Sequence, residues 1–495
     1  MTPALPAGFG VVLDRDARVL DGGRVLLGGS PRRALRLSPA GVAAFARLRA
    51  DGSVTDERTG RLARRLVDAG VAHPRPATVR AAGATVIVPV RDRAAALDRC
   101  LGALAGADVL VVDDGSADPA AVASVAARHG ARLLRRPESG GPAAARNTGL
   151  AALAPRPAAP PRVDHGETQD PAAAEPAFLH DQLLSGEVVA FVDSDCVPSP
   201  GWLRRLAGHF ADPAVVAVAP RIVPVVAPDA GRVLGAFAAA RSPLDLGPDE
   251  ALVRPGGRIS YVPTAALLVR RSALDGFDEA LRYGEDVDAV WRLIGGGGRV
   301  RYDPSVTVAH AEPASWPAWL RRRHHYGTSA GPLARRHPGR LAPLVLAPWP
   351  AAVMALLLAR RPVLATAAGA LATARLAVRL RRDAIPSSAA APMIAEATVA
   401  TLTSTGRAVT QLALPAAVAA AAMSGRRRRR LVTLAALLAA PAVHDWLRLR
   451  PSLDPVRWTL ASTADDLAYG TGVWRGAIRA RTAQPLLPRR PTSQS

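Results

Sequence analysis

Short apolar runs that end abruptly on polar residues recur through the first two-thirds of the chain. Thr85–Val90, Val109–Val112 and Val188–Val192 have the length and the β-branched or apolar character of buried strands. Helix-like stretches follow the first two of these runs, at Ala94–Leu104 and Ala120–Arg128. Alternating strands and helices predict a doubly wound, mostly parallel α/β sheet, in which ligands bind at the carboxyl ends of the strands.

The pattern continues as far as residue 310, with one interruption. Further strands are expected at Val215–Ala219, Ile259–Pro263, Ala266–Val269 and Val306–Ala309. Residues 155–187 are rich in proline, alanine and acids and have no periodicity. We therefore expect a disordered insertion there, inside a domain that spans residues 82–335.

A small α+β module is expected before this domain, at residues 5–80. Short alternating strands precede Ser38-Pro39, which is a typical helix start with the serine as N-cap. A second helix ends at Gly70, and a short strand follows it. The order is winged-helix-like and resembles modules that bind precursor peptides for modifying enzymes. A packing domain without a ligand is the alternative.

Apolar stretches dominate residues 341–480, and an arginine run at Arg426–Arg430 interrupts them. A spanning helix needs about 20 apolar residues, and several stretches approach that length. We expect an apolar helical region associated with the membrane, with its arginines on the cytosolic side. A soluble or interfacial helical domain is the alternative. Residues 484–495 are expected to form a disordered tail.

The composition changes this picture in three ways. The net charge is +22, but the chain has no lysine and only 4% aromatic residues, which disfavours a nucleic-acid-binding function. The two cysteines do not suggest a disulfide framework or a zinc site. The N-terminus lacks the apolar segment of a signal peptide, so catalysis is expected in the cytosol or at its membrane face.

Acidic residues stand at two of the predicted strand ends. Asp113 and Asp114 follow one strand, and Asp193 and Asp195 follow another. Close carboxylates such as Asp193 and Asp195 repel each other unless a cation neutralises them, and oxygen ligands favour Mg²⁺ or Mn²⁺ together with a diphosphate. A polar turn at the end of the strand is the alternative for the second pair.

Other residues with suitable chemistry lie nearby in the pattern. Arg146 follows Gly140-Gly141 at a helix start, where an anion can bind, although such glycines also form ordinary turns. Asp286, preceded by Glu285, is a candidate general base or a simple helix cap. His310 ends the last strand and is a candidate metal ligand or a structural histidine.

Five segments in order carry a resemblance to family 2 inverting glycosyltransferases with the GT-A fold. They are TVIVPVRDR, VLVVDDGSAD, GGPAAARNTG, FVDSDC and YGEDVDAVWRL. The resemblance implies that Pro89 and Asp114 line a uracil pocket beside Asp113. It also implies that Arg146, Asp193 and Glu285 lie near the nucleotide sugar.

The same resemblance implies a metal-dependent, inverting transfer from a UDP-sugar. Asp195 would bind the divalent ion, with Asp193 shared between ribose and metal. His310 would complete the metal site, and Asp286 would be the catalytic base. The long insertion at 155–187 departs from the family pattern.

Two sequences near the N-terminus, LPAGFGVVLDRDARVL and LLGGSPRRALRLSP, resemble the mycofactocin-system subfamily of actinobacteria. That resemblance implies a UDP-glucose donor, β-linked glucose and a peptide-derived acceptor held by the N-terminal module. A membrane glycosyltransferase of cell-surface polysaccharide or glycolipid synthesis is the alternative. A basic protein that binds nucleic acid is a second alternative, which would leave Asp193, Asp195 and Asp286 without a role.

Overall fold

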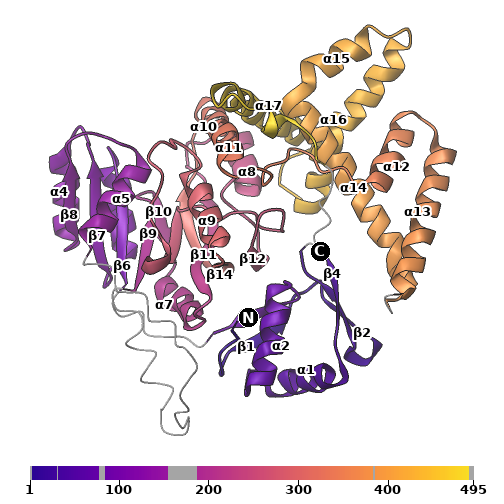
Figure 1. The fold of residues 1–495 in the computed structure, drawn as a ribbon. Helices are drawn as coiled ribbons and strands as arrows, with labels where there is room; N and C mark the ends of the chain where they lie inside the picture. The colour runs from indigo at the N-terminus through magenta and orange to yellow at the C-terminus, as the bar shows by residue number, and fades with distance from the viewer. Residues whose placement is uncertain (1–2, 31, 77–83, 154–186, 383–384, 490–495) are drawn as a thin grey trace. The chain divides into compact units, whose positions relative to one another are not determined.

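The structure is a computed structural model that describes residues 3–30, 32–76, 84–153, 187–382 and 385–489 (Figure 1). Contacts divide it into two compact units, Met1–Val225 with Pro243–Ala311 and Val226–Ser242 with Glu312–Ser495. The predicted disordered insertion lies outside the described residues, apart from its last residue, Glu187. The end of the predicted tail, residues 490–495, also lies outside them.

The N-terminal module has the elements that its sequence predicts. Its elements are β1 (Gly10–Leu13), β2 (Arg18–Leu20), β3 (Val25–Gly28), β4 (Arg33–Arg36), α1 (Pro39–Asp51), α2 (Glu57–Asp68) and β5 (Ala72–Arg75). Strands β2, β3 and β4 form one antiparallel sheet, and β1 pairs with β5. Ser38 caps α1 by accepting a hydrogen bond from the Gly41 amide. The module is α+β, and its assignment to the winged-helix class stays a prediction.

Ion pairs join this module to the sheet of the same unit. Arg64 on α2 donates two hydrogen bonds to Asp212, at 2.5 and 2.7 Å, and both side chains are buried. Arg299 donates two more to Asp68 at the end of α2, each of 2.6 Å. Removing one partner of a buried pair leaves an uncompensated charge. Deletion of the module would therefore leave Asp212 and Arg299 without these partners.

A nine-stranded mixed sheet forms the centre of the first unit. Its strands are β6 (Thr85–Val90), β7 (Asp108–Asp114), β8 (Arg132–Arg136), β9 (Val188–Val192), β10 (Cys196–Pro198), β11 (Val215–Val225), β12 (Ala251–Val253), β13 (Ala266–Arg270) and β14 (Arg299–Ala311). Their order is β10-β14-β11-β13-β9-β6-β7-β8, with β12 beside β14. The half from β9 to β8 is parallel, as predicted. The other half is mixed, because β13 runs antiparallel to both β9 and β11.

The strand expected at Ile259–Pro263 is wrong. These residues form no strand, although Ile259 and Val262 are buried. The chain turns back on itself instead, since the Arg254 amide donates to the Ile259 carbonyl across a turn that contains Gly256 at φ +75°. The burial of this loop therefore explains its strand-like apolar sequence.

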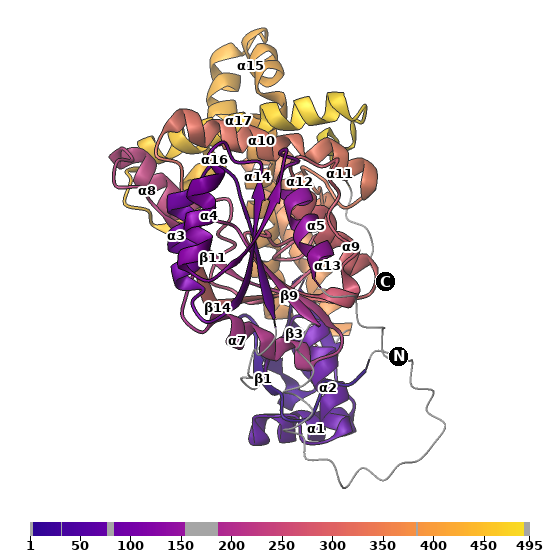
Figure 2. The same ribbon diagram turned by 90° about the vertical axis from the view of Figure 1, so that its left-hand side faces the viewer.

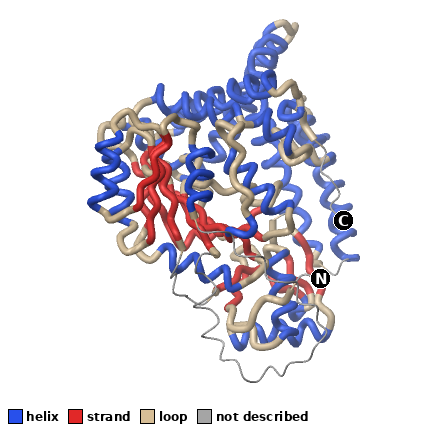
Figure 3. The backbone as a smooth tube through the Cα atoms, turned by 60° about the vertical axis from the view of Figure 1, so that its left-hand side comes forward, coloured by secondary structure: helices blue, strands red, loops and turns tan. Residues whose placement is uncertain are grey.

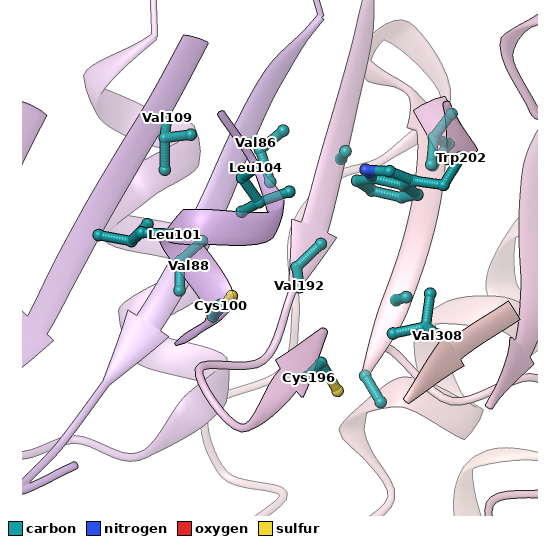
Figure 4. Packing of buried hydrophobic residues seen from close by; sticks show 14 of the residues in the cluster. Val86, Val88, Cys100, Leu101, Leu104, Val109, Val192, Cys196, Trp202 and Val308 are labelled. Carbon is teal, nitrogen blue, oxygen red and sulfur yellow. The ribbon is translucent and has the colours of Figure 1, made fainter. Parts of the chain in front are cut away.

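Helices cover both faces of the parallel half. They are α3 (Ala94–Ala103), α4 (Pro119–Arg128) and α5 (Pro142–Ala152). Further along the chain, α7 (Trp202–Ala207) contacts β11 and β14, and α9 (Glu285–Gly295) contacts β14, in the mixed half. Figure 2 shows α3 and α4 on one face of the sheet and α5 on the other. The core under α3 contains Val86, Val88, Leu101 and Leu104 (Figure 4). On the opposite face a Cβ at Gly149 would lie 2.7 Å from Ile87, so glycine allows α5 to approach β6.

The described regular elements of the second unit are helices (Figure 3). They are α8 (Arg232–Arg241), α10 (Trp316–Thr328), α11 (Ala330–Arg336), α12 (Pro348–Leu358), α13 (Pro362–Arg382), α14 (Ala390–Ala408), α15 (Leu414–Ala422), α16 (Arg427–Leu449) and α17 (Pro455–Arg479), with short 3-10 and π segments. Phe237, Trp319 and Trp458 form a buried cluster. This packing places α8 with the C-terminal helices, so the unit boundary falls at Ala311 rather than near residue 335.

Polar contacts inside the helical unit hold α17 in place. Asp465, which is buried on α17, accepts hydrogen bonds from Trp319 Nε1 at 2.9 Å and from Arg323 Nε at 2.7 Å. The start of the expected tail is ordered, because residues Gln484–Leu486 form a 3-10 turn and the Arg489 amide donates to the Leu344 carbonyl. Among the residues that the structure describes, two helices, α13 and α16, are long and apolar enough to cross a membrane, by length and composition.

Candidate functional site

The two acids at the end of β7 are buried and already have partners. Asp113 accepts hydrogen bonds from the Ser116 amide at 3.0 Å and from Arg135 at 2.5 Å. Its neighbour Asp114 accepts from Ser139 Oγ and also pairs with Arg136. Pro89 on β6 lies in register with Val112, one position before Asp113, and is partly exposed. The predicted uracil-pocket residues are thus neighbours on adjacent strands.

The glycine-rich loop before α5 binds an anion that belongs to the chain itself. The amides of Gly140 and Gly141 donate to the Asp114 carboxylate at 3.0 and 2.8 Å. Gly141 has φ +88°, and a Cβ at Gly140 would lie 2.8 Å from Ala144. The sequence predicts that these amides bind a ligand anion, but in the structure they donate to the carboxylate of Asp114.

The acids at the end of β9 are more accessible than those of β7. The strand ends in a turn in which the Cys196 amide donates to the Asp193 carbonyl at 2.9 Å. Asp193 Oδ1 accepts a hydrogen bond of 2.7 Å from Arg146, and Asp195 pairs with Arg93. The Asp193 and Asp195 side chains are 32% and 17% exposed, so each can also meet a ligand from outside the chain.

Antiparallel pairing of β10 with β14 brings His310 to Asp195. The pairing places Cys196 opposite His310, and His310 Nε2 lies 3.8 Å from Asp195 Oδ1. The carboxylate oxygens of this set suit Mg²⁺ and Mn²⁺, and the imidazole nitrogen is a ligand that transition metals accept more readily than Mg²⁺ does. No group of three or more such donors is already assembled among the residues that the structure describes.

Arg146 on α5 connects the β9 turn to the start of α9. It is buried and donates 3.0 Å to Glu285 Oε1 and 2.7 Å to Asp193 Oδ1. Its guanidinium also lies over the Phe277 ring, 5.5 Å from the ring centroid. Burial by itself lowers the pKa of Arg146, but the two carboxylates have the larger effect, so the pKa lies above its ordinary value. The arginine therefore stays charged.

Asp286 stands in the first turn of α9 and has an unusual acidity. The helix starts after Gly284, which has φ +83°, and Asp286 remains partly exposed. Desolvation raises the pKa of Asp286 to about 7, and the charges of Glu285 and Asp193 act in the same direction. The Val287 amide and Arg146 oppose this rise. A carboxylate with a pKa near 7 is suited to general base catalysis at neutral pH.

Two residues of this region were not identified from the sequence. Arg93 pairs with Asp195, and Asn147 holds the loop before α9 through hydrogen bonds of 2.8 Å to the Phe277 carbonyl and to Glu279. Both residues lie inside motifs that were recognised, namely RDR and RNTG. Their position in these motifs was the available signal, but their partners are distant in sequence.

The sequence motifs match two family models. Residues 85–154 match "Glycosyl transferase family 2", and residues 188–394 match "Glycosyl transferase family group 2". The parallel half of the sheet and the acids at its strand ends lie within these two matches. With the full-length similarity described next, they show that the chain belongs to glycosyl transferase family 2 and is a glycosyltransferase.

The chain is similar to "Pre-mycofactocin glycosyltransferase" of Mycobacterium tuberculosis, strain CDC 1551 / Oshkosh, and to the protein of the same name from strain ATCC 25618 / H37Rv. Each is 41% identical over 506 aligned positions, covering 98% of both sequences. A solved structure, "Crystal structure of GalNAc-T7 with UDP, GalNAc and Mn2+", covers 51% of each chain at 13% identity. Its TM-score of 0.32 is too low to support an argument.

Proposed function

We propose that the chain transfers a hexose, β-linked glucose, from a UDP-sugar to a peptide-derived acceptor, the precursor of mycofactocin. The observation that carries this proposal is the 41% identity, over 98% of both sequences, to relatives named for that precursor. The accessible acids at the end of β9 and the base candidate Asp286 support the same reaction.

In this proposal Asp195, with Asp193 and His310, holds Mg²⁺ or Mn²⁺. The bound ion would neutralise the charge that develops on the leaving diphosphate. Asp193 also contacts the ribose, and Pro89, Asp113 and Asp114 border the uracil. Arg146 and Glu285 lie near the nucleotide sugar, where they connect Asp193 to α9.

The transfer step is a single displacement. Asp286 accepts the proton of the acceptor hydroxyl, and the oxygen attacks the anomeric carbon from the face opposite the UDP. One bond forms and the bond to the diphosphate breaks, so the anomeric configuration inverts. Since the step needs one base and no covalent intermediate, a second nucleophilic carboxylate is not required.

The helical unit supports a location at the membrane. Helices α13 and α16 are of spanning length, and α16 begins with the run Arg427–Arg430. Exposed large apolar side chains on these helices are Val363, Leu364, Leu371, Val378, Val432, Val443, Leu447 and Leu449. We propose association with the cell membrane, with the arginines and the catalytic unit on the cytoplasmic side. The same helices favour the alternative, a glycosyltransferase with a glycolipid or polysaccharide acceptor.

A donor-by-acceptor screen read by mass spectrometry tests the proposal. UDP-glucose with a peptide-derived acceptor should give a product heavier by one hexose, and Asp286→Asn should give none. Transfer only to lipid or glycan acceptors would contradict the peptide assignment and favour the alternative. Peptide binding by the N-terminal module is measured on the full chain, because deletion would unpair Asp212 and Arg299.

A further inference from the structure

Arg146 has contacts that differ from those expected of an arginine that binds a donor phosphate. Both terminal nitrogens donate to carboxylates of the chain, one to Glu285 and the other to Asp193. The side chain is 3% exposed, and the Phe277 ring covers the guanidinium. Each terminal nitrogen keeps a second N–H, but a donor phosphate could reach it only by displacing the side chains that bury the guanidinium, which costs more than an exposed contact.

The two partners of Arg146 belong to the two halves of the proposed reaction. Asp193 follows β9 at the nucleotide side, whereas Glu285 is the residue before Asp286 on α9. The guanidinium therefore fixes the distance between the metal-binding turn and the helix that carries the base. Without it, Glu285 and Asp286 would lose the arginine cation that lies beside them, and these neighbouring acids would repel each other more strongly.

The next residue of α5 holds the same loop at a second point. Asn147 donates to the Phe277 carbonyl and accepts from the Phe277 amide, each at 2.8 Å. Gly276 makes this contact possible, because it has φ +98° and a Cβ there would lie 2.9 Å from Asn147 Oδ1. Helix α5 therefore holds both ends of the segment from Gly276 to Glu285, once through an amide and once through a charge.

We propose that Arg146 is a positioning residue for the transfer step, which holds α9 and its base against the β9 turn instead of binding the donor phosphates. Asn147 supports the same segment without a charge. This inference rests on the proposed function, because it takes Asp286 as the base. It goes further because it assigns the positioning of α9 and Asp286 to one buried guanidinium.

The charged groups around Asp286 make the proposal testable by pH. They are Glu285 on its own helix, Arg146 from α5 and Asp193 after β9. Arg146 favours the ionised form of Asp286, and Glu285 disfavours it. Loss of the positive charge should therefore move the acid limb of kcat/KM to higher pH, and loss of the Glu285 charge should move it to lower pH.

The experiment compares Arg146→Met, Arg146→Lys, Glu285→Gln and Asn147→Ala in the full-length chain. We expect Arg146→Met to lower kcat and to raise the acid limb by about one pH unit. Arg146→Lys should restore the limb but not kcat, because lysine lacks the two-pronged geometry. Asn147→Ala should lower kcat and leave the limb in place. UDP affinity, measured by calorimetry with Mn²⁺, should stay within about threefold of wild type for Arg146→Met, whereas a phosphate ligand should lose about ten- to a hundredfold.

An unmoved acid limb in Arg146→Met, or a loss of UDP affinity as large as the loss of kcat/KM, would overturn the proposal. If Arg146→Met does not fold, as judged by circular dichroism, Glu285→Gln decides. In Glu285→Gln, a lower kcat together with an acid limb of kcat/KM at lower pH supports the proposal, and wild-type values for both overturn it. Failure of the proposed function is seen separately, as a wild-type chain that transfers no hexose to the peptide-derived acceptor.

Discussion

The ends of β7 and β9 look alike in sequence but differ in the folded chain. Each strand is apolar and finishes on a pair of acids, Asp113-Asp114 and Asp193-Ser194-Asp195. The first pair is buried and receives hydrogen bonds from loop amides and arginines. The second pair stays partly accessible and meets two arginines and a histidine. Acids at a strand end can thus organise a loop or remain open to a ligand, and the local sequence does not distinguish the two.

The largest expected effect comes from removing the candidate base Asp286 on α9, the helix that Arg146 connects to the acids after β9. Asp286→Asn keeps the shape of the side chain but cannot accept the acceptor's proton, so transfer should fall by about 10²- to 10⁴-fold. UDP binding should be retained, because the substitution leaves the acids of both strand ends in place. Hexose transfer followed by mass spectrometry and calorimetry with UDP measure the two effects.

The exposed Glu57 on α2 provides a control, since Glu57→Gln removes an acid from a side chain that is 73% exposed. It should leave transfer unchanged. Wild-type activity in Asp286→Asn would show that another residue is the base.

The second prediction tests the open pair directly. Asp195→Ala should abolish the increase in UDP affinity that Mn²⁺ produces, a loss of at least about a hundredfold, because residues that merely support a metal ligand are worth about ten- to a hundredfold. Thermal stability without metal should change little, since Asp195 is partly exposed. Calorimetry with and without Mn²⁺ gives the comparison. An unchanged metal effect would mean that the β9 turn is only a polar turn.

The third prediction concerns the acids after β7, where we expect a loss of stability. Asp114→Ala removes the acceptor for two loop amides and Ser139 and leaves Arg136 without its carboxylate partner. Breaking a buried pair of this kind costs about 3 kcal/mol, so thermal unfolding should occur at a distinctly lower temperature. Asp118→Ala is the matched control: it removes only the exposed N-cap of α4 and should cost about 1 kcal/mol. Equal losses in the two variants would contradict the structural role of Asp114.

The smallest expected effect is the pH dependence of the unmodified chain. The pKa of Asp286 is raised to about 7, mainly by desolvation, and the base acts in its ionised form. Activity should therefore be full above about pH 8 and should fall about tenfold for each unit below about pH 7. Initial rates of kcat/KM from pH 5 to 9 measure this limb. A limb near pH 4 would show that Asp286 is solvated and has the ordinary acidity of an aspartate.

Most secondary structure of the first unit was predictable because it depends on local patterns. The period of apolar residues located β6, β7 and β9, and Ser38-Pro39 located the start of α1. The buried loop around Ile259 was misjudged, since burial makes a loop as apolar as a strand. The packing of α8 with the C-terminal helices was not predictable, because Phe237 contacts Trp319 and Trp458 across more than 75 positions of the chain.

The sequence by itself determined where acids, glycines and apolar runs stand, and through them the family and the candidate base. Only the tertiary structure decided that Asp113 and Asp114 are buried and that Asp193 and Asp195 are partly exposed. Arg146 reaches Glu285 across 139 positions, and His310 meets Asp195 through the pairing of β10 with β14. The physical reason is that burial and ion pairing depend on which segments the folded sheet brings together, and neighbours along the chain do not specify these partners.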